Sequence, residues 1–146
     1  MASAKADTTE KFNCTSEELF KIITDYETYP EFLPELKNVK ILKKSKDKKI
    51  MEYHVSLIKT FKYQLEAKEK KNETVEFHFT EGDVFKSMSG KWTLKESGKG
   101  KCTAHYEVEA SFGLLVPSAL AKTLVSVNLP TMMSNFKKRV KEVYGK

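Results

Sequence analysis

Arginine is nearly absent from this sequence of 146 residues: Arg139 is the sole arginine among 26 basic side chains. Because specific contacts to bases and phosphates favour the planar guanidinium fork, this scarcity argues against specific DNA recognition. Lysine can still give a non-specific attraction to nucleic acid or anionic lipid, and the net charge is +6. Since the lysines alternate with apolar residues, the simpler interpretation is a solvated outer face of a sheet.

Long apolar runs and cysteine pairs are also missing. No stretch of 18 apolar residues occurs, so no transmembrane helix is predicted, and residues 1–11 resemble neither a secretory signal nor a transit peptide. Cys14 and Cys102, the two cysteines, have no metal-binding or Cys-x-x-Cys spacing. These absences predict a reduced, cytoplasmic protein without a metal site, with a peripheral position at the inner membrane face as a further expectation.

The alternation that a sheet requires is present from residue 38 to residue 112. Apolar residues recur at every second position in six runs, and turn signals such as Ser97-Gly98-Lys99-Gly100 end the runs. The connections are short, so the strands should form an antiparallel meander with one dry face and one wet face. A further strand is predicted at residues 4–13, followed by a helix that Thr15 or Ser16 caps and that ends near Thr24.

The last part of the chain is predicted to be helical over residues 118–144, and Pro130 should kink or divide this helix. Residues 110–136 contain a single charge, Lys122, so this segment must be buried or face something apolar. We therefore predict one α+β domain over residues 1–146 with the helix-grip fold. In this fold a curved antiparallel sheet of six to seven strands wraps around a long C-terminal helix, with two short helices after the first strand.

The second short helix is expected in the segment Asp-Tyr-Glu-Thr-Tyr-Pro-Glu-Phe-Leu-Pro at residues 25–34. Pro30 and Pro34 prevent a continuous helix, so a short helical turn with a large apolar face is predicted. Such a segment covers something apolar. A cap on the core and one side of a cavity entrance are the two interpretations.

Catalytic patterns are weak. The three histidines, His54, His78 and His105, fall in the polar phase of their strands and should point to solvent. No metalloprotease, nucleophile-triad or phosphate-loop motif occurs, and no carboxylate is predicted on the inward phase of residues 51–112. We therefore predict a protein that is not an enzyme and requires no cofactor. A cyclase-type enzyme with an inward tyrosine as its acid is the least favoured alternative.

A cavity is predicted because one helix cannot fill the space that a strongly curved sheet encloses. Aromatic side chains could close this space, or an apolar ligand could occupy it. Inward tyrosine and tryptophan need a partner for the O–H or N–H group, which a ligand or the sheet edge can provide. The residues predicted to line the cavity or its mouth are Phe32, Leu33, Tyr53, Val55, Tyr63, Phe77, Met88, Trp92, Tyr106, Leu115, Leu120, Leu124, Met132 and Phe136.

The segment 25–34, the step Gly90-Lys91-Trp92 and the ending at residues 136–144 together carry a family resemblance. Over about residues 6–144 the chain resembles the coenzyme Q-binding, polyketide cyclase-like family of the START (SRPBCC) superfamily. The resemblance implies that ubiquinone or a related lipid binds in the cavity without being converted. The family that the chain resembles also includes a bacterial branch, the ribosome association toxin.

The preferred hypothesis is a carrier or chaperone for an isoprenoid quinone or a similar hydrophobic lipid. Phe32, Leu33 and the loop at residues 113–117 would form the mouth, and the inward tyrosines and Trp92 would orient a polar head group. The lysine-rich surface suggests peripheral contact with an anionic membrane. The alternative is a ribosome-associating regulator that uses the basic run at residues 37–49 and the basic helix end.

Overall fold

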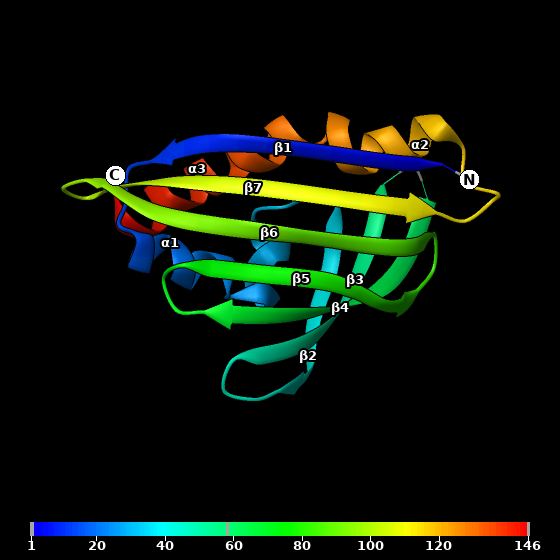
Figure 1. The fold of residues 1–146 in the computed structure, drawn as a ribbon, viewed down its shortest axis with the longest axis horizontal. Helices are drawn as coiled ribbons and strands as arrows, with labels where there is room; N and C mark the ends of the chain where they lie inside the picture. Colours follow the sequence, from blue (N-terminus) through cyan, green and yellow to red (C-terminus); the bar gives the residue numbers. More distant parts are fainter. Residues whose placement is uncertain (1, 58, 146) are drawn as a thin grey trace.

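The computed structural model describes residues 2–57 and 59–145. A strongly curved antiparallel sheet with the strand order β1-β7-β6-β5-β4-β3-β2 forms most of the molecule (Figure 1). Its strands are β1 (Ser3–Phe12), β2 (Leu36–Lys44), β3 (Lys48–Leu57), β4 (Lys59–Lys70), β5 (Thr74–Gly82), β6 (Phe85–Gly98) and β7 (Lys101–Phe112). Every strand after β1 pairs with the next one along the chain, and β1 closes the order against β7, so the predicted meander is confirmed.

Two short helices follow β1, as predicted: α1 (Ser16–Ile23) and the 3₁₀ helix η1 (Tyr26–Glu31). A reciprocal capping box fixes the start of α1. The Glu18 N–H donates to the Thr15 hydroxyl oxygen at 3.1 Å, and the Thr15 N–H donates to the Glu18 carboxylate at 2.9 Å. Helix η1 lies inside the segment 25–34, where the two prolines limit it to about two turns.

The C-terminal helix is divided, as Pro130 predicts. It consists of α2 (Ser118–Lys122), the π-helical segment η2 (Thr123–Val127) and α3 (Leu129–Tyr144). The Asn128 N–H donates to the Thr123 carbonyl at 3.2 Å, a wide helical turn just before the proline. Pro130 is the second residue of α3, where its missing N–H costs nothing because the first N–H groups of a helix have no partner within it.

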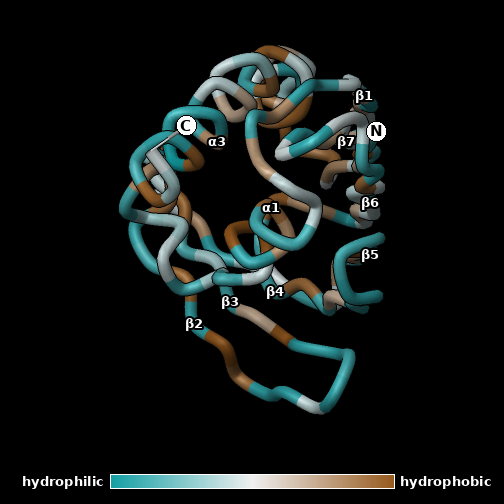
Figure 2. The backbone as a smooth tube through the Cα atoms, turned by 90° about the vertical axis from the view of Figure 1, so that its left-hand side faces the viewer, coloured by the Kyte–Doolittle hydropathy of each residue, from teal (hydrophilic) through white to brown (hydrophobic). Residues whose placement is uncertain are grey.

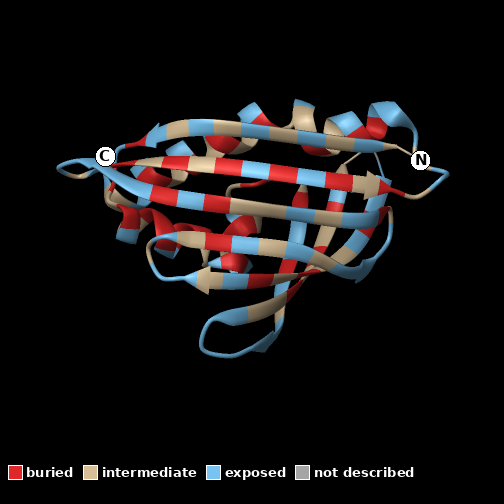
Figure 3. Cartoon of the chain, viewed as in Figure 1, coloured by how far each residue is buried: buried red, intermediate tan, exposed pale blue. Residues whose placement is uncertain are grey.

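Burial alternates along the strands (Figure 3). On β7, Cys102, Ala104 and Tyr106 are buried and the residues between them are partly or fully exposed, which confirms the predicted inward phase. The histidines lie on the other face: His54 pairs with Glu52, and His105 bonds to Thr9. The inward face and the helices that cover it enclose the core.

The hairpin of β2 and β3 projects from the rest of the molecule, and its tip is hydrophilic (Figure 2). The strand β2 is one edge of the sheet and β1 is the other. The segments α2, η2 and α3 pack mainly on β1 and β7, while η1 packs on β2. The helices therefore cover the concave face of the sheet, with α2, η2 and α3 near the β1 edge and η1 near the β2 edge.

Candidate functional site: an internal cavity

A cavity of about 170 Å³ lies between the concave face of the sheet and the helices. Strands β2 to β7 line it on one side, and α1, η1, η2 and α3 line it on the other. Most of its lining is aliphatic or aromatic, and neither lysine nor arginine is among its residues in the described part of the chain. The interior is therefore suited to an apolar, uncharged occupant.

Eleven of the fourteen residues predicted for this site line the cavity: Leu33, Tyr53, Val55, Tyr63, Phe77, Met88, Trp92, Tyr106, Leu124, Met132 and Phe136. Ten of them come from the inward phase of the strands or the apolar stripe of the C-terminal helices, and Leu33 lies between η1 and β2. Sequence periodicity therefore located the cavity wall, while the role of these residues in binding a ligand stays a prediction.

Three predicted residues lie elsewhere. Phe32 packs edge-on against Phe136, with ring centroids 5.1 Å apart, and Arg139 lies over its other side at 5.3 Å. Leu120 is buried on α2, which contacts β1, and Leu115 is 97% exposed on the loop after β7. These three residues do not line the cavity, because apolar character does not say which face of a loop or helix turns inward, and the role of Phe32 and Leu115 at its mouth stays a prediction.

The Gly90-Lys91-Trp92 step builds one wall of the cavity. A Cβ atom on Gly90 would lie 2.2 Å from Cζ of Phe77, so only glycine leaves room for that ring. Phe77 then stacks on Tyr106 at 6.1 Å between centroids, and Trp92 meets Tyr106 edge-on at 4.9 Å. The glycine is therefore a packing requirement of the aromatic wall.

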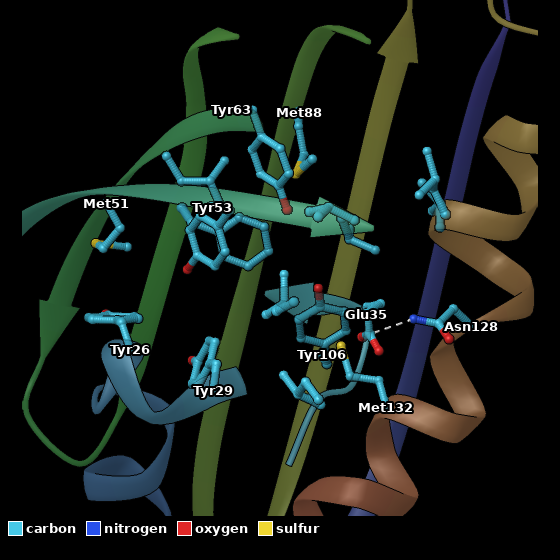
Figure 4. A pocket seen from close by; sticks show the side chains of 18 of the residues that line it. Tyr26, Tyr29, Glu35, Met51, Tyr53, Tyr63, Met88, Tyr106, Asn128 and Met132 are labelled. Atoms are coloured by element: carbon cyan, nitrogen blue, oxygen red, sulfur yellow. Dashed lines mark hydrogen bonds between the residues drawn. The ribbon is translucent and has the colours of Figure 1, made fainter. Parts of the chain in front are cut away.

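Three tyrosines of the sheet direct their rings into this space (Figure 4). Tyr53 and Tyr63 stack with centroids 5.3 Å apart, and the Tyr63 hydroxyl points toward that of Tyr106. Within the described residues, the hydroxyls of Tyr53, Tyr63 and Tyr106 have no hydrogen-bond partner. Burial raises the pKa of all three phenols, so they remain neutral donors at physiological pH.

Two further tyrosines, both on η1, also line the cavity, and the sequence analysis did not assign them to the site. Tyr26 donates to the Glu69 carboxylate at 2.7 Å, and Tyr29 donates to the Ile23 carbonyl. Burial, reinforced at Tyr26 by the hydrogen bond to Glu69, raises the pKa of both phenols. Their spacing of three residues, which places both side chains on one face of a 3₁₀ helix, was the signal that could have identified them.

Glu69 corrects the prediction that the inward phase carries no carboxylate. It continues the phase of Leu65 and Ala67 on β4, and its side chain is only 10% exposed. Lys49 lies 3.0 Å from its carboxylate, so the buried charge is paired. The carboxylate therefore anchors Tyr26, and its charge is already neutralised by a partner.

A polar contact joins opposite sides of the cavity. The Asn128 side-chain amide donates to the Glu35 carboxylate at 3.3 Å, and both residues line the cavity (Figure 4). Glu35 precedes β2 at one edge of the sheet, whereas the helical segments around Asn128 pack on β1 at the other edge. We call this contact the Glu35–Asn128 bridge. Sequence reasoning missed it because no local pattern relates residues so far apart.

No group of histidine, cysteine or acidic residues in the described part of the chain is arranged to hold a metal ion. Likewise, none of the helices formed by the described residues is long and apolar enough to cross a membrane. Cys14 and Cys102 are fully buried and form no disulfide. The cytoplasmic location stays a prediction.

Comparison with known proteins gives a consistent result. A family described as polyketide cyclase / dehydrase and lipid transport matches residues 13–137. The coenzyme Q-binding protein COQ10, mitochondrial, of Dictyostelium discoideum is 29% identical over 132 residues, or 88% of this chain. The chain spans 64% of the length of that relative.

Solved structures share the fold. A START superfamily protein from Mycobacterium smegmatis superposes with a TM-score of 0.84 at 18% identity, covering 95% of this chain and 98% of that one. The Zhui aromatase/cyclase from Streptomyces sp. R1128 gives 0.85 at 12% identity, covering 95% and 94%. At such identities the likeness shows the fold alone, and it confirms the predicted helix-grip arrangement.

Proposed function

The chain belongs to the polyketide cyclase / dehydrase and lipid transport family, and from this premise we propose that it holds a neutral apolar ligand in its cavity, as a carrier or chaperone. An isoprenoid quinone is the first candidate. The observation that carries the proposal is the set of three phenol hydroxyls, on Tyr53, Tyr63 and Tyr106, that belong to the cavity lining and have no hydrogen-bond partner among the described residues. The similarity to a protein named as coenzyme Q-binding supports the same ligand class.

The chemistry of the lining favours a ligand with neutral acceptor oxygens. A hydroxyl that faces an apolar cavity without a hydrogen-bond partner is poorly solvated, and a ligand that offers carbonyl or ether oxygens gives it an acceptor. A quinone ring has such oxygens on an otherwise apolar frame. A fatty acid fits less well, because its carboxylate would meet no cation in the lining and would lie near Glu35.

The cavity volume limits how much of a ligand fits. A dry cavity of about 150 Å³ is sufficient for one benzene ring, and this cavity measures about 170 Å³. It therefore suits a ring-sized head group, and we propose that an isoprenoid tail leaves at the Glu35–Asn128 bridge, whose two residues line the cavity and are only partly buried. Affinity should then depend on the head group much more than on tail length.

Binding is favoured over catalysis. Among the described residues that line the cavity there is no histidine or cysteine, and the Glu35 carboxylate already accepts a hydrogen bond from Asn128. The raised pKa values make the inward tyrosines weaker acids than an ordinary phenol. A cyclase-type reaction would need its general acid from this set.

Two measurements test the proposal. Solvent extraction of the purified chain, followed by mass spectrometry, should release a neutral lipid with a quinone-like head group. Titration with a short-tailed ubiquinone should quench Trp92, the sole tryptophan, which lies in the cavity wall. If extraction releases no lipid and quinone leaves the fluorescence unchanged, the proposal is wrong.

Substitutions test whether the tyrosine hydroxyls form hydrogen bonds to the ligand. Tyr63→Phe and Tyr106→Phe should each weaken quinone binding about tenfold, the value of one hydrogen bond of roughly 1.4 kcal/mol. Tyr144→Phe is the matched control, because its hydroxyl bonds to the Glu18 carbonyl outside the cavity. Equal affinities for all three variants would show that apolar contact alone holds the ligand.

A second candidate function is association with ribosomes, favoured by the charge of the projecting hairpin. Residues 37–49 contain seven lysines and one aspartate, so their net charge equals the +6 of the entire chain. Binding to ribosomal subunits should then fall steeply with salt concentration. Failure of the chain to sediment with subunits at low salt would remove this candidate.

A further inference from the structure

The loop at residues 113–117, between β7 and α2, presents two large apolar side chains to solvent. Leu114 is 84% exposed and Leu115 is 97% exposed, more than any other large hydrophobic residue in the described part of the chain. The loop extends beyond the sheet near the N-terminus (Figure 1). Exposing two adjacent leucine side chains to water costs free energy, and such exposure indicates a surface that an apolar partner covers.

The exposure is imposed by a well-anchored loop base. The Gly113 N–H donates to the Val84 carbonyl and the Val116 N–H donates to the Gly113 carbonyl, both at 3.0 Å. On either side, Phe112 is fully buried and Val116 packs against the core. With both ends anchored in this way, the short tip between them carries both leucines on the outside of the molecule.

Basic side chains accompany the leucines. Lys86 follows Phe85, which pairs with Phe112 at the base of the loop, and Lys122 ends α2, the helix that the loop enters. Both lysines are exposed. Asp83, in the neighbouring β5–β6 turn, is the acidic residue at this position, and its carboxylate accepts from the Lys62 N–H. The surface around the loop is therefore apolar at its tip and positive at its base.

We propose that the loop at residues 113–117 docks the protein onto a lipid bilayer that contains anionic lipids. The tip would insert Leu114 and Leu115 among the acyl chains, and Lys86 and Lys122 would lie at the level of the head groups. Membrane association through one weak apolar anchor requires a second, electrostatic signal, and this loop combines the two.

A bilayer fits this surface better than a second protein does. A stable protein interface buries on the order of 1,000 Å² or more, with a well-packed centre, and a tip of two leucines supplies only a small part of that. A fluid lipid surface needs no complementary shape, so a small tip suffices. The positive base also matches the negative potential of anionic lipids.

The purpose of docking rests on the proposed function, although docking itself can be measured without any quinone. The loop leads through α2 into η2, whose Leu124 and Val125 line the cavity. A protein that exchanges a lipid with a membrane would therefore touch the membrane next to a helical segment of its own cavity wall.

Sedimentation with phospholipid vesicles tests the proposal. The unsubstituted chain should bind vesicles of phosphatidylcholine with phosphatidylglycerol, and bind more weakly at high salt or to phosphatidylcholine alone. Substituting both leucines, Leu114→Ser with Leu115→Ser, should weaken binding about tenfold or more. Lys86→Glu with Lys122→Glu should weaken binding to the anionic vesicles and leave the weak binding to phosphatidylcholine nearly unchanged.

Matched controls lie on the projecting hairpin. Leu42 is also exposed, at 41%, and Lys43 and Lys44 are exposed lysines on the same strand. Leu42→Ser, and Lys43→Glu with Lys44→Glu, should change vesicle binding by less than about twofold. The proposal is overturned if the unsubstituted chain does not bind anionic vesicles, if the double leucine variant binds as well as the unsubstituted chain, or if the hairpin variants lose binding instead.

Quinone delivered without vesicles separates this proposal from the proposed function. The double leucine variant should quench Trp92 with quinone as the unsubstituted chain does, because neither leucine lines the cavity. Vesicle binding without quinone binding would support docking and contradict the quinone ligand. Quinone binding without vesicle binding would do the reverse.

Discussion

Two groups of tyrosines border the same cavity, and they differ in whether their hydroxyls have hydrogen-bond partners. On η1, Tyr26 donates to Glu69 and Tyr29 donates to a backbone carbonyl, so the protein itself supplies the hydrogen-bond acceptors of both hydroxyls. On the sheet, the hydroxyls of Tyr53, Tyr63 and Tyr106 have no partner among the described residues.

The difference shows that burial alone does not separate structural tyrosines from ligand-facing ones. Tyr26 and Tyr106 are both buried, and the pKa of each is raised mainly by burial. What distinguishes them is hydrogen bonding, because a buried donor with a partner stabilises the fold, whereas one without a partner costs free energy until a ligand supplies the acceptor. We therefore assign η1 to support and the sheet tyrosines to recognition.

The largest effect is expected from alkaline pH, which should lower the free energy of unfolding through the tyrosines of both groups. The native state keeps these phenols protonated above pH 10, where unfolded tyrosine ionises, so it binds more protons than the unfolded state. Stability should hold below about pH 10 and fall above it, by roughly 1.4 kcal/mol per pH unit for each such tyrosine. Urea unfolding between pH 7 and pH 11 measures this.

Lysine deprotonation in the same pH range is controlled with a variant. Tyr63→Phe with Tyr106→Phe removes two of the raised phenols, leaves every lysine in place, and should make the decline shallower. An unchanged slope in this variant would mean that the tyrosines do not govern the alkaline loss.

Phe136 contacts Tyr29 of the first group and Trp92, which in turn meets Tyr106 of the second group, so its removal should disturb both. Its ring meets Tyr29 edge-on at 5.9 Å and Trp92 at 5.1 Å, and it is buried. Phe136→Ala should lower the free energy of unfolding by about 3–5 kcal/mol through lost burial and the space left behind. Val143→Ala, at a half-exposed position of the same helix, should change it by less than about 0.5 kcal/mol. A loss below about 1 kcal/mol for Phe136→Ala would show that the wall collapses around the gap.

The sequence was sufficient for the wall of the cavity and insufficient for its polar contacts. Strand alternation placed Tyr53, Tyr63 and Tyr106 inward because a strand has only two faces, and Pro130 located the division of the C-terminal helix. The pairing of Tyr26 with Glu69 depends on β4 lying beneath η1, a contact between residues 43 positions apart. The exposure of Leu115 could not be predicted for a related reason, since a loop has no periodicity that shows which of its side chains face the interior.

Single hydroxyl deletions compare the two groups directly. Tyr26→Phe removes a hydrogen bond to a nearly buried carboxylate and should cost about 1.5–3 kcal/mol of unfolding free energy. Tyr106→Phe removes a hydroxyl without a described partner and should be neutral or slightly stabilising in the absence of ligand. Urea unfolding of both variants without added quinone checks this order. If Tyr106→Phe proves the more costly, the assignment of support and recognition is reversed.

The smallest effect is expected at the Glu35–Asn128 bridge, which links the β2 edge of the sheet to the C-terminal helical segments across the cavity. Both residues are only partly buried, so Asn128→Ala should lower the free energy of unfolding by no more than about 1 kcal/mol. The bridge should matter more for kinetics, because in the proposed route the ligand tail passes between the two groups that the bridge holds together. Stopped-flow quenching of Trp92 by quinone should therefore show faster association in Asn128→Ala, with a smaller change in equilibrium affinity. Glu35→Gln retains an acceptor for the Asn128 amide, so its association rate should stay close to that of the unsubstituted chain; equal rates in all three proteins would place the ligand's route elsewhere in the wall.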